Sequence, residues 1–510
     1  MLVKNAKFIL IIAAMALIVI GATACQSVLG QSNSGQPSTG ASAQSTLGQS
    51  AKAPEPTKVT YVGQFSVTPS AGLAGTTVKA AGNGFNPNSE LQIVWQGVNG
   101  SWKVNTDNGT FHGRQFKDDL QPITTVRTDA AGQFEAAFTV PDGFGFIHDV
   151  LVINKDGVIK NKAGFEVKMQ ASISPSSGPV GTPIAIELRG IGWRPLENSW
   201  TVLYDNKFTG WMSSVTTDGL ARATIPAAGT PGKHIIQIIH GSATFPYMNM
   251  QQSPQPDRPQ WTLEFIITDG AAVLPPPAQT QSLPVERGIA PASTGQPVLW
   301  TDMASGIVGT PVILKGSGLP SGEPIQLIWF RMTGSRVSGQ GYQETSVSLG
   351  TATAGANGEI EFPFKALDDL GGPHRIEAQI KGEKVAETAF TITPSAFAIE
   401  PASGSAGTTI TLHLKGVGWT ETANIYTLVY DNAYFGYACG FNSQGDVTVF
   451  LPAAGEPGWH FIDLYPGIYK GEDMSQVNNF RIPQLTASVD HPGEKLPVFH
   501  FAFLITSGGN

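Results

Sequence analysis

Two copies of one residue set carry the side chains best suited to chemistry. Each copy has a tyrosine, an Asp-Asn pair and, further on, a histidine: Tyr204, Asp205, Asn206 and His234, then Tyr430, Asp431, Asn432 and His460. A carboxylate with an imidazole can act as a general base or as part of a metal site. One Asp and one His make an incomplete ligand set, however, and no H-E-x-x-H motif supplements them. Asp-Asn between alternating apolar stretches is typical of a hairpin turn, so we predict a structural role.

An enzyme with a site in these repeated modules is a remote alternative. A site in these repeated modules would need Asp205, His234 and a third polar group within hydrogen-bond reach, about 3 Å. Adjacent carboxylates at Asp118-Asp119 and Asp368-Asp369 could bind calcium, but neither pair belongs to a D-x-D-x-D-G series, so we expect solvated loop charge. Nucleophile, phosphate-loop and dinucleotide motifs are missing. We therefore predict no catalysis, no metal and no cofactor.

Aromatic and arginine side chains are the stronger indication of binding. They occur in a predicted long loop, Gly97 to Thr125, whose counterpart in a later repeat is eight residues shorter, and again around the two Asp-Asn turns. Aromatic residues and arginine are typical anchors of recognition surfaces, and segments of variable length are where recognition tends to reside. Packing inside the fold explains them equally well. The candidate ligand-binding residues are Trp102, Phe111, Arg114, Tyr204, Trp211, Tyr430 and Tyr437.

Internal repetition determines the expected architecture. The segment 190–241 returns at 416–467 with an offset of 226 (416 − 190) and 19 identical residues among 52 aligned positions. Four module starts share a Gly-Thr pair, and a G-x-G follows after 7, 9, 7 and 9 residues, which indicates alternating A-B-A-B modules. Short alternating apolar stretches bounded by Gly, Pro, Asn and Asp predict strands. The fold class is therefore all-β, with four tandem sandwiches.

The module outline resembles the IPT/TIG-type immunoglobulin-like domains of bacterial surface proteins. It reads P-x-x-G-x-x-G-T, a strand, G-x-G with Phe or Trp, and T-D-x-x-G-x-F, as in Thr128 to Phe134, followed by Val140-Pro141. The third module departs from it, with Met303 in place of the Pro and Ala354 in place of the Asp. The resemblance implies immunoglobulin-like sandwiches and specifies no function.

The N-terminal segment predicts export. Residues 1–24 have two lysines, an apolar run of about 13 residues and small residues before Cys25, as in a signal peptide. Cys25 resembles the lipobox cysteine of bacterial lipoproteins, although Ala22 stands where that family usually has Leu. The resemblance implies a lipid anchor on Cys25 at the outer face of a bacterial membrane. The alternative is cleavage that releases a secreted protein. Residues 25–57 are rich in Ser, Gly and Gln and predict a flexible tether.

Together these patterns predict a non-catalytic surface lipoprotein that binds or scaffolds envelope or extracellular components. The first alternative is a carbohydrate-binding or adhesion protein, with cell-wall polysaccharide or a surface protein as partner. A net charge of −8 without a basic tract argues against nucleic acid. The oligomeric state and the ligand are not specified. The expected modules are A1 (58–168), B1 (169–270), A2 (297–393) and B2 (394–508), with a proline-rich linker (271–296) acting as a stiff spacer.

Overall fold

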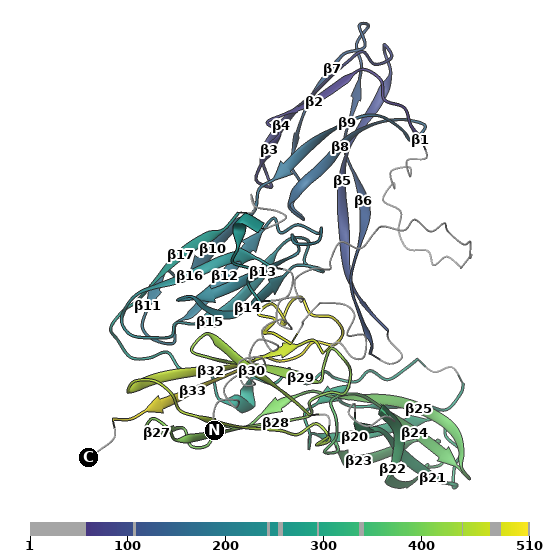
Figure 1. Cartoon of the computed structure of the whole chain (residues 1–510). Coiled ribbons are helices and arrows are strands. Elements are labelled where there is room, and N and C mark those ends of the chain that lie inside the picture. Colours follow the sequence, from purple (N-terminus) through teal and green to yellow (C-terminus); the bar gives the residue numbers. More distant parts are fainter. Residues whose placement is uncertain are drawn as a thin grey trace, which may run out of the picture. The chain divides into compact units, whose positions relative to one another are not determined.

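The structure, a computed structural model, describes residues 58–105, 109–241, 245–252, 259–292, 295–335, 341–440, 442–469 and 481–507. In these ranges the protein is all-β and consists of four immunoglobulin-like sandwiches in the predicted A-B-A-B order (Figure 1). The predicted signal peptide, Cys25 and the tether lie outside the described residues. The described helices are two single 3-10 turns, η1 (Met250–Gln252) and η2 (Ala278–Thr280).

Module A1 combines a three-stranded sheet with a six-stranded one. The smaller sheet has the order β2-β4-β7, with β2 (Gln64–Thr68), β4 (Thr77–Asn83) and β7 (Phe134–Thr139). The larger has the order β1-β9-β8-β5-β6, with β3 also paired to β9: β1 (Lys58–Val59), β3 (Ala71–Gly72), β5 (Glu90–Val104), β6 (Phe111–Arg127), β8 (Phe146–Asn154) and β9 (Val158–Val167).

Module B1 repeats this plan with a three-stranded and a five-stranded sheet. The first is β10 (Gln170–Ser174), β12 (Pro183–Arg189) and β15 (Ala221–Pro226). The second, in sheet order, is β11 (Ser177–Gly178), β17 (Trp261–Ile267), β16 (Gly232–His240), β13 (Ser199–Tyr204) and β14 (Lys207–Ser213).

Modules A2 and B2 have the same two sheets. In A2 they are β18 (Val298–Thr301), β20 (Pro311–Ser317) and β23 (Ile360–Lys365), then β19 (Ser305–Gly306), β25 (Glu383–Ile392), β24 (Gly372–Ile380), β21 (Pro324–Ser335) and β22 (Gly341–Thr353). In B2 they are β26 (Ser395–Ala396), β28 (Thr409–Lys415) and β31 (Val447–Pro452), then β27 (Ser403–Gly404), β33 (Phe499–Ile505), β32 (Gly458–Gly467), β29 (Ile425–Tyr430) and β30 (Ala433–Cys439).

Alternating side chains build the core of each sandwich. In β12, for example, Ile184, Ile186 and Leu188 are at most 1% exposed, while the residues between them point away from the core. This period of two is the pattern predicted from the sequence. Each module has one such buried cluster, and the B1 cluster also takes in Val429 and Tyr465 of B2.

A glycine at a constant position turns the chain at the end of one strand in every module. Gly84, Gly190, Gly318 and Gly416 have φ angles of 71°, 71°, 69° and 70°. Glycine adopts this left-handed conformation without a steric penalty. Each follows the glycine of its Gly-Thr pair by nine positions (84 − 75, 190 − 181, 318 − 309, 416 − 407). In A modules the turn is made by the second glycine of the G-x-G motif, and in B modules by the first. The gaps of 7 and 9 residues between the Gly-Thr pair and the motif therefore correspond to one constant spacing.

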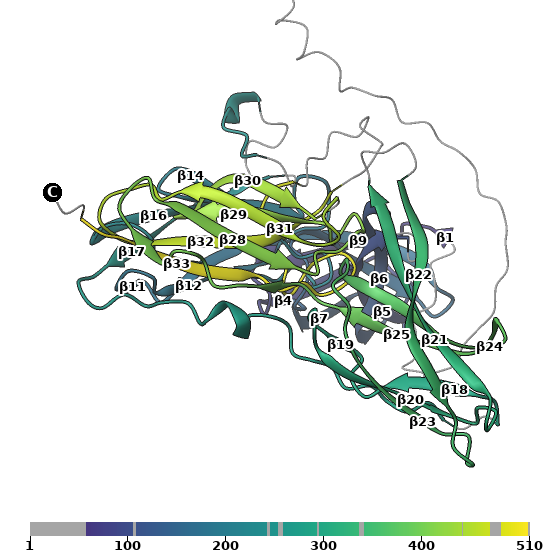
Figure 2. The ribbon, with the colours of Figure 1, turned by 90° about the horizontal axis from the view of Figure 1, so that it is seen from below.

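The variable segments of the A modules are strands, not the loops that the sequence suggested. In A1, β8 pairs only with Leu91 to Trp95 of β5, so the rest of β5 pairs with β6 alone. We call this two-stranded extension, residues 96–104 and 111–120, the A1 ribbon; it projects far beyond β8 and β9 in Figure 1. Its counterpart is the hairpin β21–β22 of A2, which Figure 2 shows as another extended ribbon.

The proline-rich linker packs against the modules, so the prediction that it acts as a spacer between the two A-B units is wrong. Val273 donates its N–H to the Val180 carbonyl oxygen at 2.8 Å, and Ala278 is buried in the B2 core. Gln281 exchanges two hydrogen bonds with the backbone of His500, at 2.6 and 2.8 Å. B1 and B2 also touch directly, since the Thr209 hydroxyl donates to the Asn432 carbonyl oxygen at 2.7 Å.

Candidate functional site

The Asp-Asn pairs form hairpin turns, as predicted, and the aspartate of each turn contacts the repeated histidine, which was not predicted. Asp205 and Asn206 both have positive φ, 49° and 63°, which is the geometry of a type I′ turn. Asp205 Oδ2 lies 2.6 Å from His234 Nδ1, and Asp205 Oδ1 accepts a hydrogen bond from the Ile235 N–H at 2.8 Å. His234 Nε2 lies 2.8 Å from the Thr230 carbonyl oxygen. Both ring nitrogens are therefore engaged inside the module. The third group near the ring is a backbone carbonyl, not the polar side chain that an acid-base site would need.

Module B2 repeats this Asp-His contact. His460 Nδ1 lies 2.6 Å from Asp431 Oδ2, and Nε2 lies 2.8 Å from the Glu456 carbonyl oxygen. Two acceptors favour the doubly protonated ring. The hydrogen bond to Asp431 raises the pKa of His460 above 6.5, against the opposing effect of burial.

We expect the stabilisation from His460 to fall as pH rises. Since the folded pKa is the higher one, the contribution is complete below the unfolded pKa, about 6.5, and is lost as pH rises through the folded value. The decrease in thermal midpoint caused by His460→Gln should therefore be larger at about pH 5.5 than at about pH 8.5. A difference that stays constant or grows between these two pH values would contradict this mechanism.

A buried carboxylate joins the A1 ribbon to both B modules. Asp490 is fully buried and accepts the Trp102 indole N–H at 2.9 Å from the ribbon. From B1 it accepts the Ser213 hydroxyl at 2.5 Å, the Val215 N–H at 2.8 Å, and the Thr216 N–H and hydroxyl at 3.0 and 2.8 Å. Asp490 itself belongs to the B2 segment that precedes β33. Five donors around one carboxylate satisfy its hydrogen-bonding capacity away from water.

Arg114 supplies the positive charge of this junction. Its guanidinium lies between two indole rings, with Cζ 5.7 Å from the centroid of Trp102 and 5.4 Å from that of Trp211, and it donates to Asn198 Oδ1. Burial lowers the pKa of Arg114 to about 10, while the charge of Asp490 works in the opposite direction. The group remains a cation at neutral pH. Arginine between aromatic faces gains cation–π attraction that increases when water is excluded.

An apolar cluster surrounds these polar contacts. Phe111 and Trp211 are fully buried together with Ile468 and Ile482 of B2. The Phe111 N–H donates to Glu421 Oε2 at 2.6 Å, which fixes the end of the ribbon. A two-stranded ribbon is marginally stable on its own, so these contacts explain how it keeps its conformation.

The structure thus brings four of the seven candidate ligand-binding residues together: Trp102, Phe111, Arg114 and Trp211. They contact other modules of the same chain, which is the packing alternative that the sequence left open. Tyr204 is 1% exposed in the B1 core, and Tyr430 is half-buried with its hydroxyl donating to the Ala454 carbonyl oxygen at 2.9 Å. Tyr437 is 44% exposed and is the candidate that remains available on the described surface.

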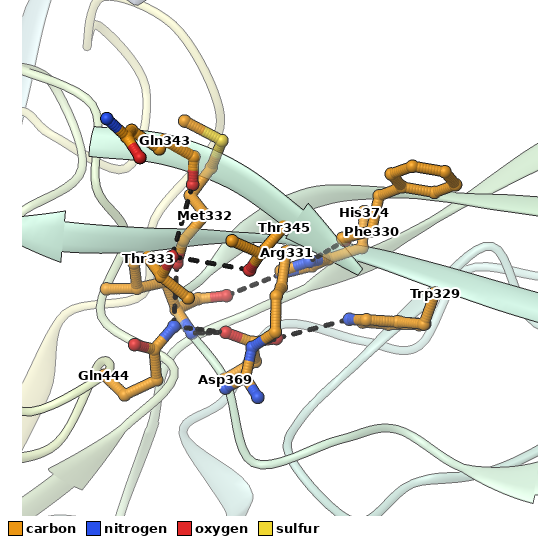
Figure 3. A network of polar contacts seen from close by, with 11 residues as sticks. Trp329, Phe330, Arg331, Met332, Thr333, Gln343, Thr345, Asp369, His374 and Gln444 are labelled. Carbon is orange, nitrogen blue, oxygen red and sulfur yellow. Dashed lines mark hydrogen bonds and ion pairs between the residues drawn. The ribbon is translucent and has the colours of Figure 1, made fainter. Parts of the chain in front are cut away.

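A second buried carboxylate joins A2 to B2 (Figure 3). Asp369 is fully buried, pairs with Arg331 Nε at 3.0 Å and accepts the Trp329 indole N–H at 3.2 Å. Gln444 of B2 donates to it at 2.6 Å and to the Met332 carbonyl oxygen at 2.8 Å. The expectation of solvated loop charge is therefore wrong for Asp369, because its neighbours supply donors that replace water. For Asp118 the expected exposure is correct, but the residue lies in strand β6 and not in a loop, and it accepts a hydrogen bond from Gln96.

The sequence reasoning missed residues that repeat at the same offset as the modules. His148 and His374 (374 − 148 = 226) stack on Trp95 and Trp329, each with ring centroids 4.6 Å apart. Burial lowers the pKa of His148. The offset alone could have identified this pair. Asp490 lies outside the repeated segments 190–241 and 416–467, so its role becomes visible only in the structure.

One backbone contact of the A-to-B junction is the same in both copies. The Gly145 N–H donates to the Ile191 carbonyl oxygen at 2.9 Å, and the Gly371 N–H donates to that of Val417 at 3.1 Å. A Cβ atom at Gly145 or Gly371 would lie 1.7 or 2.0 Å from the carbonyl oxygen of Gly190 or Gly416. Only glycine allows this approach of two backbones. The duplicated unit is therefore an A-B pair with a defined contact between its modules.

The described ranges contain no group of three or more His, Cys, Asp or Glu side chains arranged to hold a metal. Among the same residues no helix has the length and apolar character needed to cross a membrane. Cys439 is half-buried. Cys25 cannot be compared with its prediction because it lies outside the described residues.

No protein-family model matches the chain, and no curated protein matches it. Among solved structures it is similar to a Salmonella alpha-2-macroglobulin mutant, at 12% identity over 87% of this chain and 31% of that one, with a TM-score of 0.17. A Corynebacterium diphtheriae protein described as membrane anchored matches at 14% identity over 65% and 91%, with a TM-score of 0.17. The ICAM-5 D1–D4 ectodomain fragment matches at 13% identity over 80% and 96%, with a TM-score of 0.16.

The chain spans about a third of the length of the macroglobulin that it matches. These TM-scores are too low to support a conclusion about activity or partners. The immunoglobulin-like fold therefore rests on the strand order and pairing of the chain itself.

Proposed function

We propose that the protein is a non-catalytic lipoprotein, anchored through Cys25 at the outer face of a bacterial membrane, that binds or scaffolds envelope components. The observation that carries this proposal is the use of Trp102, Arg114, Trp211 and Asp490 to join modules of one chain. Four of the seven candidate ligand-binding side chains are thus engaged in contacts within the protein. The body is thereby suited to holding a fixed surface away from the membrane.

The surface best placed for an envelope partner is the outer strand β30 of B2. Phe435, where the register of β29 and β30 shifts, and Tyr437 are 50% and 44% exposed. In B1 the residue equivalent to Tyr437 is Trp211, whose backbone exchanges hydrogen bonds with Pro483 and Leu485 at 2.9 Å each. The same position of the module thus contacts a peptide segment in one copy. In the other copy it carries a ring that is 44% exposed and has the Arg481 guanidinium carbon 5.8 Å from its centroid. Aromatic rings at such positions suit either a peptide or a sugar ring.

Anchoring and binding can be tested separately. Cys25→Ala should move the protein from the membrane fraction to the medium, and retention of the variant in the membrane would contradict the anchor. For binding, the purified protein is sedimented with isolated cell envelope. We expect Tyr437→Ala to reduce the bound fraction several-fold and Phe450→Ala to leave it unchanged, because Phe450 is 69% exposed on the other sheet of B2.

Equal sedimentation of wild type and Tyr437→Ala would exclude this surface, and an absence of sedimentation would contradict the proposed function. Protease treatment of the envelope distinguishes the two kinds of partner. Loss of binding after treatment favours a protein. Binding that survives favours the carbohydrate-binding alternative.

A further inference from the structure

The outer edge of module B1 is extended by a peptide segment that belongs to B2. Strand β14 is the last strand of its sheet, and Gln484 lies beside Trp211 in a parallel bridge. The Trp211 N–H donates to the Pro483 carbonyl oxygen, and the Leu485 N–H donates to the Trp211 carbonyl oxygen, at 2.9 Å each. Segment 483–485 therefore adds to the sheet as a short strand, through backbone groups.

A glycine inside β14 makes room for this segment. A Cβ atom at Gly210 would lie 2.6 Å from the Pro483 carbonyl oxygen and 2.9 Å from Leu485 Cδ2, so a larger residue would push the segment away. Glycine within a strand often marks a place where another backbone approaches closely. Leu485 is 3% exposed and packs into the B1 core. The glycine and the leucine together seat the segment against the edge.

Strand β30 of B2 repeats this edge without such a segment. It is also the last strand of its sheet, and Gly436 and Tyr437 follow Gly210 and Trp211 at the offset of 226 (436 − 210, 437 − 211). A Cβ atom at Gly436 would have no atom of the described residues within 4 Å. At this outer edge none of the described residues shares a backbone hydrogen bond with Tyr437. Unpaired edge groups of this kind are a template for another strand.

The exposure of the side chains agrees with an open edge. Trp211 is fully buried beneath its segment, whereas Tyr437 is 44% exposed and Phe435 is 50% exposed. The start of β30 lies against B1, where Asn432 accepts from the Thr209 hydroxyl and Tyr434 contacts the Phe208 ring. The open stretch therefore runs from Phe435 to Tyr437, and it is as long as the stretch that segment 483–485 covers in B1.

We propose that β30 binds an extended peptide of a partner protein by strand addition. The peptide runs parallel to β30, exchanges two backbone hydrogen bonds with Tyr437 and places an apolar side chain beside Gly436. Its direction, its hydrogen bonds and its apolar residue are those of segment 483–485 on β14. In this mode of recognition the backbone gives affinity and alternate side chains give specificity. The inference rests on the proposed binding role of β30 and specifies its partner as a polypeptide.

Two synthetic peptides test the proposal on the purified protein. The first copies residues 481–487 with both ends blocked, and the fluorescence anisotropy of an attached dye measures its binding. The second is identical except that the leucine corresponding to Leu485 is N-methylated, which removes the hydrogen bond that Leu485 donates to Trp211. The first peptide should bind saturably. The N-methylated peptide should bind at least about tenfold more weakly, because it lacks the donor and leaves the acceptor unpaired.

A substitution in β30 assigns the binding to this edge. Gly436→Val places a side chain where the added backbone would lie, as the close approach at Gly210 shows, and should weaken binding of the first peptide at least about tenfold. The backbone at Gly436 is extended and the space beside it is open, so a β-branched residue fits the strand. Gly164→Val in β9 is the matched control and should leave peptide binding unchanged. A Cβ atom there would contact Ile147 Cγ2 at an ordinary 3.7 Å.

Each other outcome overturns the proposal. Absence of saturable binding means that the edge does not accept a strand, and equal affinity for the two peptides means that backbone groups are not recognised. Binding that survives Gly436→Val places the peptide elsewhere, for example on β14 in exchange with segment 483–485. Sedimentation with cell envelope separates this inference from the proposed function: if Tyr437→Ala abolishes sedimentation and Gly436→Val does not, β30 binds through its ring and strand addition alone is wrong. If Gly436→Val fails to fold, the two peptides on the unmodified protein still decide.

Discussion

Asp490→Ala is expected to release the A1 ribbon from the B modules and to cause the largest loss of stability of any single substitution at this junction. The change removes the acceptor of five hydrogen bonds and leaves the buried Arg114 without its neighbouring negative charge. Removing one member of a buried charge pair typically costs about 3–5 kcal/mol. The first thermal unfolding transition should shift downward, and amides of residues 97–104 should exchange hydrogen much faster.

The exposed Asp118 provides a control on the same ribbon. It accepts one hydrogen bond, from Gln96, and faces solvent, so Asp118→Ala should change stability by less than about 1 kcal/mol. Asp490→Asn should fall between the two, because it keeps an acceptor and loses the charge. If Asp490→Ala leaves ribbon amides as protected as in the wild type, the carboxylate does not hold the ribbon in place.

Much of the fold could be predicted from the sequence because its signals are local or periodic. Alternation of Ile184, Ile186 and Leu188 marks a half-buried strand, and Asp205-Asn206 marks a hairpin turn, in each case through the physics of a few adjacent residues. The duplication at offset 226 extended these local signals to the second half of the chain.

Contacts between modules could not be predicted in the same way. Trp102 and Arg114 were recognised as anchors from residue type alone, but their partner Asp490 is almost 400 positions away and belongs to no repeat. The residue types of these two side chains indicate that they bind a partner. Residue type does not show whether that partner lies in the same chain. Prolines in the linker similarly predicted stiffness, which says nothing about the surfaces that Val273 and Ala278 contact.

Two neighbouring aspartates show that residue type alone does not predict which side chains are buried. Asp368 and Asp369 are adjacent in sequence and were assigned the same exposed role. In the structure Asp368 forms a surface pair with Lys415 and is 58% exposed at its side chain, whereas Asp369 points into the A2–B2 junction and is fully buried. Which of the two consecutive carboxylates is buried depends on the backbone orientation in the loop between β23 and β24.

This difference leads to a prediction with its own internal control. Asp369→Ala removes the partner of Arg331 and leaves the buried Trp329 indole N–H without an acceptor, so we expect a loss of about 3–5 kcal/mol. Asp368→Ala breaks an exposed pair and should cost about 1 kcal/mol or less. Thermal unfolding measures the stability of both variants, and hydrogen exchange at Gly371, whose N–H bonds to Val417, measures the junction. Similar losses for the two variants would mean that water already reaches Asp369, and the junction would then depend on the contact between glycine backbones instead.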